Sequence, residues 1–592
     1  MQIKSVAALA VLMVLMGAAA CKNPGSGGKG KNLDTLMAGY WEESLRLDPL
    51  SATSSGDNRY NDRMTITIAE SFRDTLRNFY TKYLGELGEV DTAALDADHL
   101  LSYRLLKYEM LKGIDGLKFP SHLMPINQFW GLTLDLPQLG SGTGNQPFKT
   151  VKDYDDFLKR MAVFPAWTDT AIANMRKGMA TGWVLPKTLV MKILPQLSAI
   201  ADVKVADSSI FFGPIKAYPD SLSKDKDRLS TAYRGMIETI VKPSYTRLYT
   251  FMKDEYLPKA RTSSGIGDIP QGKEYYQYLI NNWTTTNLTP DSIYNLGQAE
   301  VARIEREMTE VMTSVNFKGS LQEFFLYQNK DPQFFPFKTP KAVLDSFEAI
   351  HKMEEPALKR LFNHVPKTAF TIRQTQAFRA ASASAEYNQP SEDGTRPGIF
   401  YVPILDATKF NAIGMETLFL HEAIPGHHYQ IALQQENKSL PKFRRFLWYG
   451  AYGEGWALYS ESLGKELGLF QNPYQYFGHL SDEMHRALRL VVDVGIHYKG
   501  MTREQAIDYM LAHERTTRDE ATAEIERYMA IPAQALSYKI GQLTIRALRT
   551  KYEAAMGKDF SIQAFHDQVL DGGCVPLDIL TQNMAGWAAK RK

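Results

Sequence analysis

The chain has 592 residues, of which 44% are hydrophobic and 11% are aromatic. This length and composition can fill a large core, which excludes a disordered protein and favours either two domains or one large bilobed domain. The 68 lysines and arginines nearly balance the 66 aspartates and glutamates, so the formal net charge is +2. Because no basic block stands out, we expect no nucleic-acid partner.

The N-terminal segment has the pattern of an export signal. An uncharged apolar run follows Lys4 and ends at Ala20, and it is too short for a membrane-spanning helix, so residues 1–20 are predicted to be a signal peptide. Small residues directly before Cys21 resemble a bacterial lipobox, although Ala18 stands where leucine is usual. We therefore expect an exported lipoprotein that is held at the membrane through lipid on Cys21 and faces the periplasm or the cell surface. The alternative is ordinary signal cleavage, with Cys21 incidental.

Residues 21–32 are rich in glycine and are predicted to be a flexible tether, so the folded body should begin near Leu33. The chain has only one other cysteine, Cys574. If Cys21 carries lipid, no intramolecular disulfide can form, and stability must come from packing and a bound metal.

Helical patterns dominate the remaining sequence, which predicts a mainly α fold. Thr289 gives an N-cap before a proline, and we place a boundary there between an N-terminal helical region, residues 33–288, and a C-terminal catalytic region, residues 289–592. Two short segments rich in β-branched and aromatic residues, 370–373 and 398–403, are predicted to be strands of a small sheet next to the active-site helix.

The segment H-E-A-I-P-G-H-H is the strongest candidate for a metal site. In the common H-E-x-x-H arrangement, two histidines on one helix face bind zinc, and the glutamate between them lies beside the metal-bound water. Here His421 and Glu422 begin the motif, but His427 follows His421 by six residues, which is roughly 240° of rotation on an ideal helix.

The residues between the histidines predict a departure from ideal helix. Pro425 has no N–H to donate, and Gly426 supplies backbone freedom, so a kink or bulge can turn His427 toward His421. His428 competes as the second ligand because seven residues are two turns, but a rise of about 10.5 Å makes a shared ion difficult. We favour His427 and keep His428 as the alternative. The alternative interpretation is that the segment binds no metal and is a simple Pro-Gly turn flanked by ordinary polar histidines.

A second motif, E-G-W-A-L-Y-S-E, begins at Glu454 and is predicted to open a helix there. A catalytic zinc with two histidines and one glutamate keeps a fourth position for water, so Glu454 is the expected third ligand. Glu461 lies seven residues later on the same face and is a candidate to orient a histidine ligand. Without a metal, Glu454 would be a favourable carboxylate at a helix N-terminus.

These two motifs resemble the bacterial family designated domain of unknown function 885 (DUF885), as do R-L-V-V-D-V-G-I-H from Arg489 and the segment from Arg527 to Gly541. The family is grouped with the gluzincin metallopeptidases. The resemblance implies a large bilobed helical fold and one Zn²⁺ ion per chain, held by His421, His427 and Glu454. One departure is Ala533, where the family pattern P-G-Q has glycine.

The resemblance also implies roles for other residues. Glu422 would accept a proton from the attacking water and deliver it to the leaving amine. Candidate donors to the developing oxyanion are His497, Tyr528 and Tyr538. Candidates to capture the C-terminal carboxylate of a substrate are Arg489, Arg527 and Lys539.

The expected function is therefore zinc-dependent hydrolysis of short peptides in the cell envelope, by a carboxypeptidase, a dipeptidase or an oligopeptidase. The alternative is a helical surface lipoprotein that binds peptides or glycans and catalyses nothing.

Overall fold

The computed structural model describes residues 32–591, except for 376–383 and 391–395. The predicted signal peptide, the predicted lipidation site Cys21 and all but the last residue of the predicted tether lie outside the described residues. Within the described part of the chain, no helix combines the length and the apolar character needed to span a bilayer.

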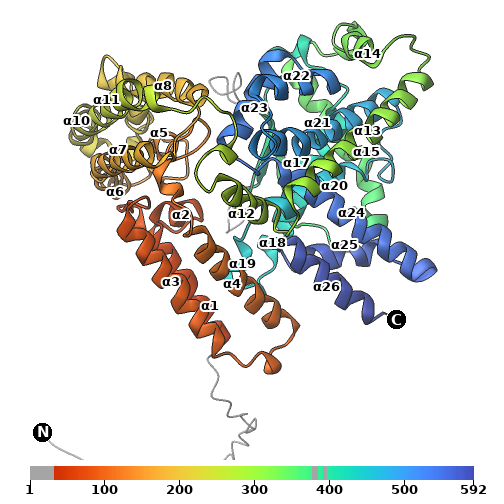
Figure 1. Ribbon diagram of the computed structural model, residues 1–592, viewed down its shortest axis with the longest axis horizontal. Helices are drawn as coiled ribbons and strands as arrows, with labels where there is room; N and C mark the ends of the chain where they lie inside the picture. Colours follow the sequence, from red (N-terminus) through yellow and green to blue (C-terminus); the bar gives the residue numbers. More distant parts are fainter. Residues whose placement is uncertain (1–31, 376–383, 391–395, 592) are drawn as a thin grey trace, which may run out of the picture.

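Helices form most of the described chain, as the sequence predicts (Figure 1). The first half contains α1 (Leu33–Leu47), α2 (Pro49–Ser54), α3 (Glu70–Gly88), α4 (Ala97–Gly116), α5 (Leu132–Gly140), α6 (Val151–Met161), α7 (Phe164–Thr181), α8 (Lys187–Ala201), α9 (Gly213–Lys216), α10 (Lys226–Met236), α11 (Lys242–Phe251) and α12 (Gly272–Thr284).

The second half of the described chain contains the three strands and the helices that carry the two candidate site motifs. They are α13 (Pro290–Ser314), α14 (Leu321–Gln328), α15 (Pro340–Leu361), β1 (Phe370–Gln374), β2 (Glu386–Asn388), β3 (Gly398–Val402), α17 (Met415–Glu422), α18 (His427–Glu436), α19 (Lys442–Arg445), α20 (Gly450–Glu461), α21 (Pro473–His497), α22 (Arg503–His513), α23 (Arg518–Ala530), α24 (Leu536–Met556), α25 (Ile562–Leu570) and α26 (Leu577–Ala589).

The predicted start of α13 is confirmed. The side chain of Thr289 accepts a hydrogen bond from the backbone N–H of Ser292 at 3.2 Å, and Pro290 occupies the first helical position. This cap satisfies one of the N–H groups that a helix leaves without an internal partner. Val301 and Ile304 lie on the apolar stripe and are buried against α21 and its neighbours.

The small sheet has the strand order β1-β3-β2. β1 pairs with β3 in parallel, with Phe370 opposite Gly398, and β2 pairs with β3 in antiparallel, with Tyr387 opposite Phe400. The two predicted strands are confirmed, and β2 is an addition that the sequence did not indicate. Phe370 packs against Phe419 of α17, with 6.3 Å between ring centroids, so the sheet lies next to the helix that carries His421.

Two hydrophobic cores divide the molecule into lobes. One core is formed only by residues between Met64 and Tyr256, and its helices α5 to α11 make the smaller lobe at the upper left of Figure 1. The larger core joins α1, α3, α4 and α12 to the helices of the C-terminal half. The larger core therefore extends across the boundary that we predicted at residue 289.

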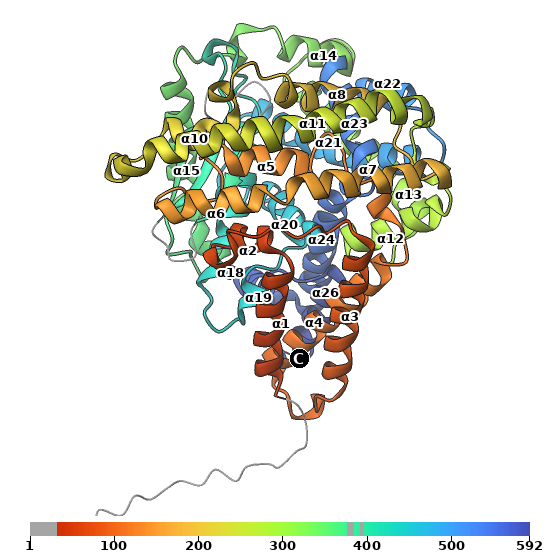
Figure 2. The same cartoon turned by 90° about the vertical axis from the view of Figure 1, so that its left-hand side faces the viewer.

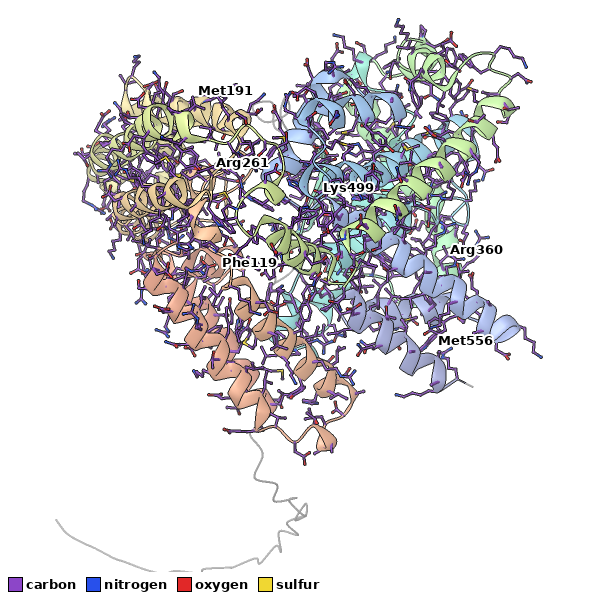
Figure 3. The ribbon with its side chains drawn as sticks, viewed as in Figure 1. Phe119, Met191, Arg261, Arg360, Lys499 and Met556 are labelled. Atoms are coloured by element: carbon purple, nitrogen blue, oxygen red, sulfur yellow. The ribbon has the colours of Figure 1, made fainter. Side chains whose placement is uncertain are left out.

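The lobes differ in how their helices run. In Figure 2, α6, α7, α10 and α11 run roughly alongside one another, while α1, α3 and α4 extend below them as a separate bundle. Arg261 lies on the segment between the lobes (Figure 3) and donates to the carbonyls of Val184 and Ser263 at 3.0 and 2.8 Å. These bonds fix the segment that leads from the smaller lobe to the larger one.

Candidate metal centre and its cavity

The His motif is divided between two helices. α17 ends at Glu422 and α18 begins at His427, so the expected kink or bulge is a complete break over residues 423–426. The Ile424–Pro425 peptide bond is cis. A Cβ atom on Gly426 would lie 2.0 Å from the carbonyl oxygen of His421, so glycine is required where the two helices meet. The break turns His427 toward His421, which six residues of continuous helix would not do.

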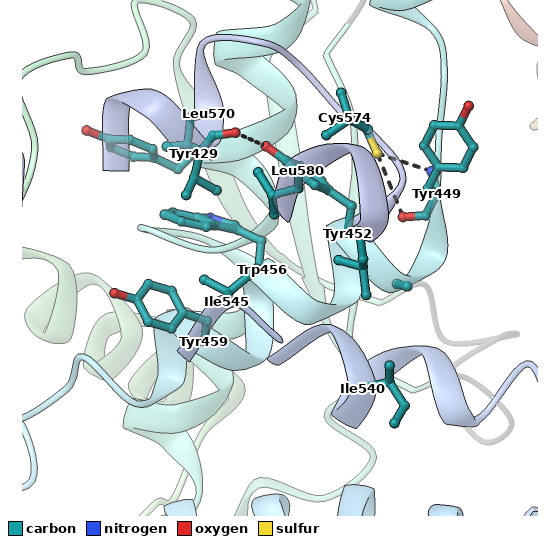
Figure 4. Packing of buried hydrophobic residues seen from close by; sticks show 14 of the residues in the cluster. Tyr429, Tyr449, Tyr452, Trp456, Tyr459, Ile540, Ile545, Leu570, Cys574 and Leu580 are labelled. Carbon is teal, nitrogen blue, oxygen red and sulfur yellow. Dashed lines mark hydrogen bonds between the residues drawn. The ribbon is translucent and has the colours of Figure 1, made fainter. Parts of the chain in front are cut away.

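A third helix, α20, holds this break in place. The carbonyl oxygen of Pro425 accepts hydrogen bonds from Nε1 of Trp456 at 2.8 Å and from the hydroxyl of Ser460 at 3.3 Å. Figure 4 shows Trp456 in the buried cluster around α20, where its ring lies 5.5 Å from that of Tyr459. The helix that supplies Glu454 is therefore anchored to the loop between the two histidines.

Nearby, the thiol of Cys574 accepts from the backbone N–H of Tyr449 at 3.1 Å (Figure 4). Cys574 is buried, and burial raises the pKa of its thiol to about 12. An uncharged, buried thiol of this kind is a packing residue.

His421, His427 and Glu454 form a group with the composition of a metal site, and one donor atom from each lies within 4.8 Å of the others. The Nε2 atoms of His421 and His427 lie 3.6 and 3.4 Å from Oε2 of Glu454. Two atoms that each bind a tetrahedral zinc ion at about 2.1 Å lie roughly 3.4 Å apart. The separations therefore fit one zinc ion. Glu454 comes from the second turn of α20, because that helix opens four residues earlier than the sequence predicted.

The electrostatics of the group also favour a cation. Burial lowers the pKa of His421, but hydrogen bonds to Glu454 and Glu461 outweigh it and raise the pKa to about 10. Burial raises the pKa of Glu454, and the positive charge of His427 together with hydrogen bonds from both histidines holds it well below its usual range. The site therefore attracts positive charge, which a proton or a divalent ion can supply.

Glu461 lies behind His421. Its Oε1 atom lies 2.7 Å from Nδ1 of His421, which leaves Nε2 of the same ring facing Glu454. This is the arrangement in which a carboxylate orients a metal-binding histidine. Nδ1 of His427 is buried and has no comparable partner among the described residues.

His428 lies on the other side of α18, toward the sheet. Its Nδ1 atom is 2.9 Å from the hydroxyl of Tyr387, and its ring lies 4.8 Å from that of Phe370. Burial lowers its pKa to about 4. The structure thus brings His427, and not His428, together with His421 and Glu454.

The group opens into a cavity of about 2490 Å³. Sites for small molecules typically measure roughly 300–1,000 Å³, so this space is larger than one small ligand requires. Side chains from both lobes line it. From the N-terminal half these include Leu50, Thr65, Phe129, Asp135, Asn145 and Ser209, and from the C-terminal half Glu386, Tyr387, Glu422, Trp448, Glu454 and Arg489.

Glu422 lines this cavity one residue after the candidate ligand His421. It is 8% exposed, and burial raises its pKa, although the charges of His421 and His427 act in the opposite direction. A buried carboxyl group whose pKa is raised above its usual range is suited to accept and return a proton.

One wall of the cavity is cationic. It is formed by Arg486 and Arg489 of α21 and by Arg527 of α23, with Glu524 among them. Nε of Arg489 donates to the hydroxyl of Tyr528 at 3.0 Å, and Nε and Nη2 of Arg527 bind Glu524 at 3.0 and 2.8 Å. Three positive charges stand against the negative charges of Glu524 and of Asp482, which lies 3.7 Å from Arg486, so this wall keeps an excess of positive charge.

The two tyrosines that are candidate oxyanion donors differ in their access to the cavity. Tyr538 lines the cavity, and the guanidinium of Arg489 lies 4.4 Å from its ring centre. Tyr528 is 1% exposed, and its hydroxyl donates to Glu524 at 2.6 Å while it accepts from Arg489. Tyr538 alone of these tyrosines is placed to meet a substrate.

His497 and Lys539 do not lie where we predicted. His497 is 1% exposed, and its ring nitrogens bind the backbone N–H of Ile266 and the carbonyl of Tyr528, both at 3.0 Å. Burial lowers its pKa to about 3, so it is a neutral core residue.

Lys539 is fully buried and donates to Glu483 and Gln542, both at 2.7 Å. Its charge is neutralised inside the bundle, because a buried ammonium group needs such partners. The predicted roles of His497 as an oxyanion donor and of Lys539 as a carboxylate-binding residue are therefore wrong.

Sequence reasoning did not single out several cavity residues, among them Phe129, Trp448, Arg486 and Glu524. Arg486 precedes Arg489 by three residues on α21, so helical spacing could have indicated it once Arg489 was chosen. No local pattern marks Phe129 or Trp448, because their positions depend on how the two lobes pack.

A family model that matches nearly the full length of the chain identifies its family. The family model described as "Bacterial protein of unknown function (DUF885)" matches residues 49–584. The chain belongs to this family. The DUF885 assignment made from the motifs is thereby confirmed, and the matched range contains every candidate site residue except Cys21.

Solved structures of similar chains show the same fold as this DUF885 protein. A crystal structure described as a "putative lipoprotein" from Colwellia psychrerythraea has 29% sequence identity and a TM-score of 0.85, and the match covers 94% of this chain and 99% of that one. A "putative lipoprotein of unknown function" from Shewanella oneidensis has 20% identity and a TM-score of 0.77, and the match covers 94% and 100%. No curated protein matches the chain.

Proposed function

We propose that this DUF885 protein is a zinc-dependent peptidase of the gluzincin type that hydrolyses short peptides in the cell envelope. The observation that carries the proposal is the meeting of His421, His427 and Glu454, beside Glu422, in one large cavity. The apolar N-terminal segment that ends at Cys21 supports export and a lipid anchor. The Colwellia psychrerythraea protein, described as a "putative lipoprotein", agrees with that location.

When bound, zinc would polarise a peptide carbonyl and make a water molecule more acidic. His421 and His427 would bind it through Nε2, and Glu454 through a carboxylate oxygen. Glu422 would accept one proton from the attacking water and deliver it to the nitrogen of the breaking C–N bond. The products would then be a carboxylic acid and an amine, and passage of the second proton of the water from the acid to the amine gives a carboxylate and an ammonium group.

Two further features of the cavity support a peptide substrate. Tyr538 lines the cavity, and we assign to its hydroxyl the role of donor to the oxyanion that develops on the attacked carbonyl. The positive wall of Arg486, Arg489 and Arg527 suits a C-terminal carboxylate, which favours a carboxypeptidase or dipeptidase activity. The size of the cavity is sufficient for several residues of an extended peptide.

The first test is the metal content of the purified chain from residue 22 onward. We expect about one zinc ion per chain, as for a three-ligand catalytic site. His427→Ala and Glu454→Ala should lose the metal. His428→Gln is the matched control, because this neighbouring histidine faces Tyr387, and it should retain zinc.

The second test is hydrolysis of a library of short peptides by the zinc-loaded protein. Glu422→Gln should keep the metal and lower kcat by about 10³-fold, within the range that general acid–base catalysis contributes. Absence of zinc after reconstitution would contradict the proposal. The better account would then be a lipoprotein that binds peptides or glycans without catalysis.

A further inference from the structure

Trp448 is an exposed aromatic residue inside the cavity. It lies in the segment between α19 and α20, 45% of its surface is exposed, and it lines the cavity together with Phe446 and Leu447. Its ring centroid lies 6.0 Å from that of the ligand His427. A large apolar side chain that stays exposed beside a metal group is available to contact a substrate.

The backbone of α20 is shaped to receive this indole. A Cβ atom on Gly453 would lie 2.1 Å from Cη2 of Trp448, which real atoms do not tolerate. Glycine at this position therefore lets the ring lie against the first turn of α20, one residue before the ligand Glu454. Gly453 thus allows the indole of Trp448 to lie beside the helical turn that carries Glu454.

Other exposed aromatic residues provide a contrast. Trp130 is 42% exposed, but it is not a cavity residue and stacks on Trp283 with ring centroids 5.8 Å apart and planes 11° apart. Phe129, which is 40% exposed, lines the cavity from the N-terminal half of the chain. Exposed aromatic surface therefore enters the cavity from two distant parts of the sequence.

We infer that Trp448 forms a specificity subsite for an aromatic or large apolar side chain of the substrate, on a residue next to the bond that is cleaved. The inference rests on the proposed peptidase function. Trp448 acts by positioning: an apolar side chain that covers the indole loses contact with water and aligns the peptide at His421, His427 and Glu454.

The size of the expected preference follows from hydrophobic pockets in general. They discriminate between side chains by about 10-fold to 200-fold. We therefore expect peptides with phenylalanine beside the cleaved bond to have a kcat/KM at least about 10-fold higher than matched alanine peptides.

The test compares Trp448→Ala, Trp448→Phe and the control Trp130→Ala with the unaltered protein, all with equal zinc content. Trp448→Ala should lower kcat/KM for the phenylalanine peptide to about the value for the alanine peptide, which removes the preference. Trp448→Phe should restore most of the preference, and Trp130→Ala should not change it. Gly453→Ala, which displaces the indole, should lower the preference while zinc is retained.

A binding measurement separates this inference from the proposed function. Calorimetry with the zinc-loaded Glu422→Gln protein should give tighter binding of the phenylalanine peptide than of the alanine peptide, and Trp448→Ala should abolish the difference. If the unaltered protein cleaves no peptide but this difference persists, the peptidase proposal fails, and Trp448 remains only a binding site for an apolar side chain. If Trp448→Ala weakens both peptides equally, or if it does not alter their ratio, the subsite is wrong whether or not hydrolysis occurs.

Discussion

Glu461 lies 2.7 Å from Nδ1 of His421, and this contact decides which ring nitrogen of that histidine is presented to Glu454. Glu461 is 1% exposed and ends α20, seven residues after Glu454 on the same helix. One helix therefore supplies both the candidate third ligand and the group that orients the first. His427 has no equivalent support at its Nδ1 atom among the described residues.

Replacement of Glu461 should therefore weaken metal binding without removing a ligand. We expect Glu461→Gln to lower zinc affinity by about 10-fold to 100-fold, the usual effect of losing a carboxylate behind a metal-binding histidine. The measurement is competition with a chromogenic chelator. Glu466→Gln is the control, because this residue binds Arg549 instead, and it should leave the affinity unchanged. Equal affinities for all three proteins would show that Glu461 has no part in the site.

The two tyrosines near Arg489 should behave differently when their hydroxyls are removed. Tyr538 faces the cavity, so Tyr538→Phe should lower kcat by about 10²-fold with little change in KM, as expected for loss of one oxyanion donor.

Tyr528 is buried with its hydroxyl bound to Glu524 and Arg489. Tyr528→Phe should instead lower the free energy of unfolding by about 1–3 kcal/mol and leave kcat close to normal. Steady-state kinetics and urea denaturation on both variants check the assignment, and a large kcat loss in Tyr528→Phe alone would reverse it.

Structural features that depend only on nearby residues could be predicted from the local sequence. Helix caps such as Thr289, the strands near Phe370 and Gly398, and the departure from helix at Pro425 all follow from residue chemistry within one or two turns. The local sequence did not predict that the helix would be interrupted completely at Pro425. A complete break held by Trp456, which lies 31 residues from Pro425, depends on a contact between separate helices.

Residues far apart in the sequence account for the misplaced candidates. His497 looked like a catalytic group, but Ile266 and Tyr528 occupy both of its ring nitrogens, and only the fold brings those partners together. β2 has three residues, too few for a periodic pattern to indicate a strand. The sequence also did not indicate Trp448, because its exposure inside a cavity depends on how distant parts of the chain pack together.

Asp493 should make the stability of the protein depend on pH. It is fully buried and accepts hydrogen bonds from the hydroxyl of Tyr276 at 2.5 Å and from the N–H of Ala533 at 3.1 Å. Burial outweighs these bonds and raises its pKa from 3.8 to about 7. Between these values the folded state keeps a proton that the unfolded chain has lost, so the contribution of Asp493 to stability falls as the pH rises through this window.

Asp493→Asn removes this titration while its amide oxygen can still accept both bonds. The difference in free energy of unfolding between the variant and the unaltered protein should therefore move in favour of the variant as the pH rises from about 4 to about 7, and then level off. Urea denaturation across this range gives the difference. A difference that does not change with pH would mean that Asp493 is already ionised throughout.

Ala533 offers the most direct test of backbone strain. Its φ angle is +68°, a left-handed conformation that costs an L-residue roughly 1–2 kcal/mol. Glycine removes that cost but adds up to about 1 kcal/mol of entropy to the unfolded chain. Ala533→Gly should therefore stabilise the protein by about 0.5–1 kcal/mol, because the N–H that binds Asp493 is retained.

Ala535 provides the matched control two residues away. It is also fully buried, but its φ angle is −63°, which alanine adopts without strain. Ala535→Gly should therefore destabilise the protein by about 0.5–1 kcal/mol, so the two substitutions should shift the urea midpoint in opposite directions. If both variants are destabilised equally, the loss of a buried methyl group outweighs the backbone at both positions, and the left-handed conformation of Ala533 carries no measurable strain.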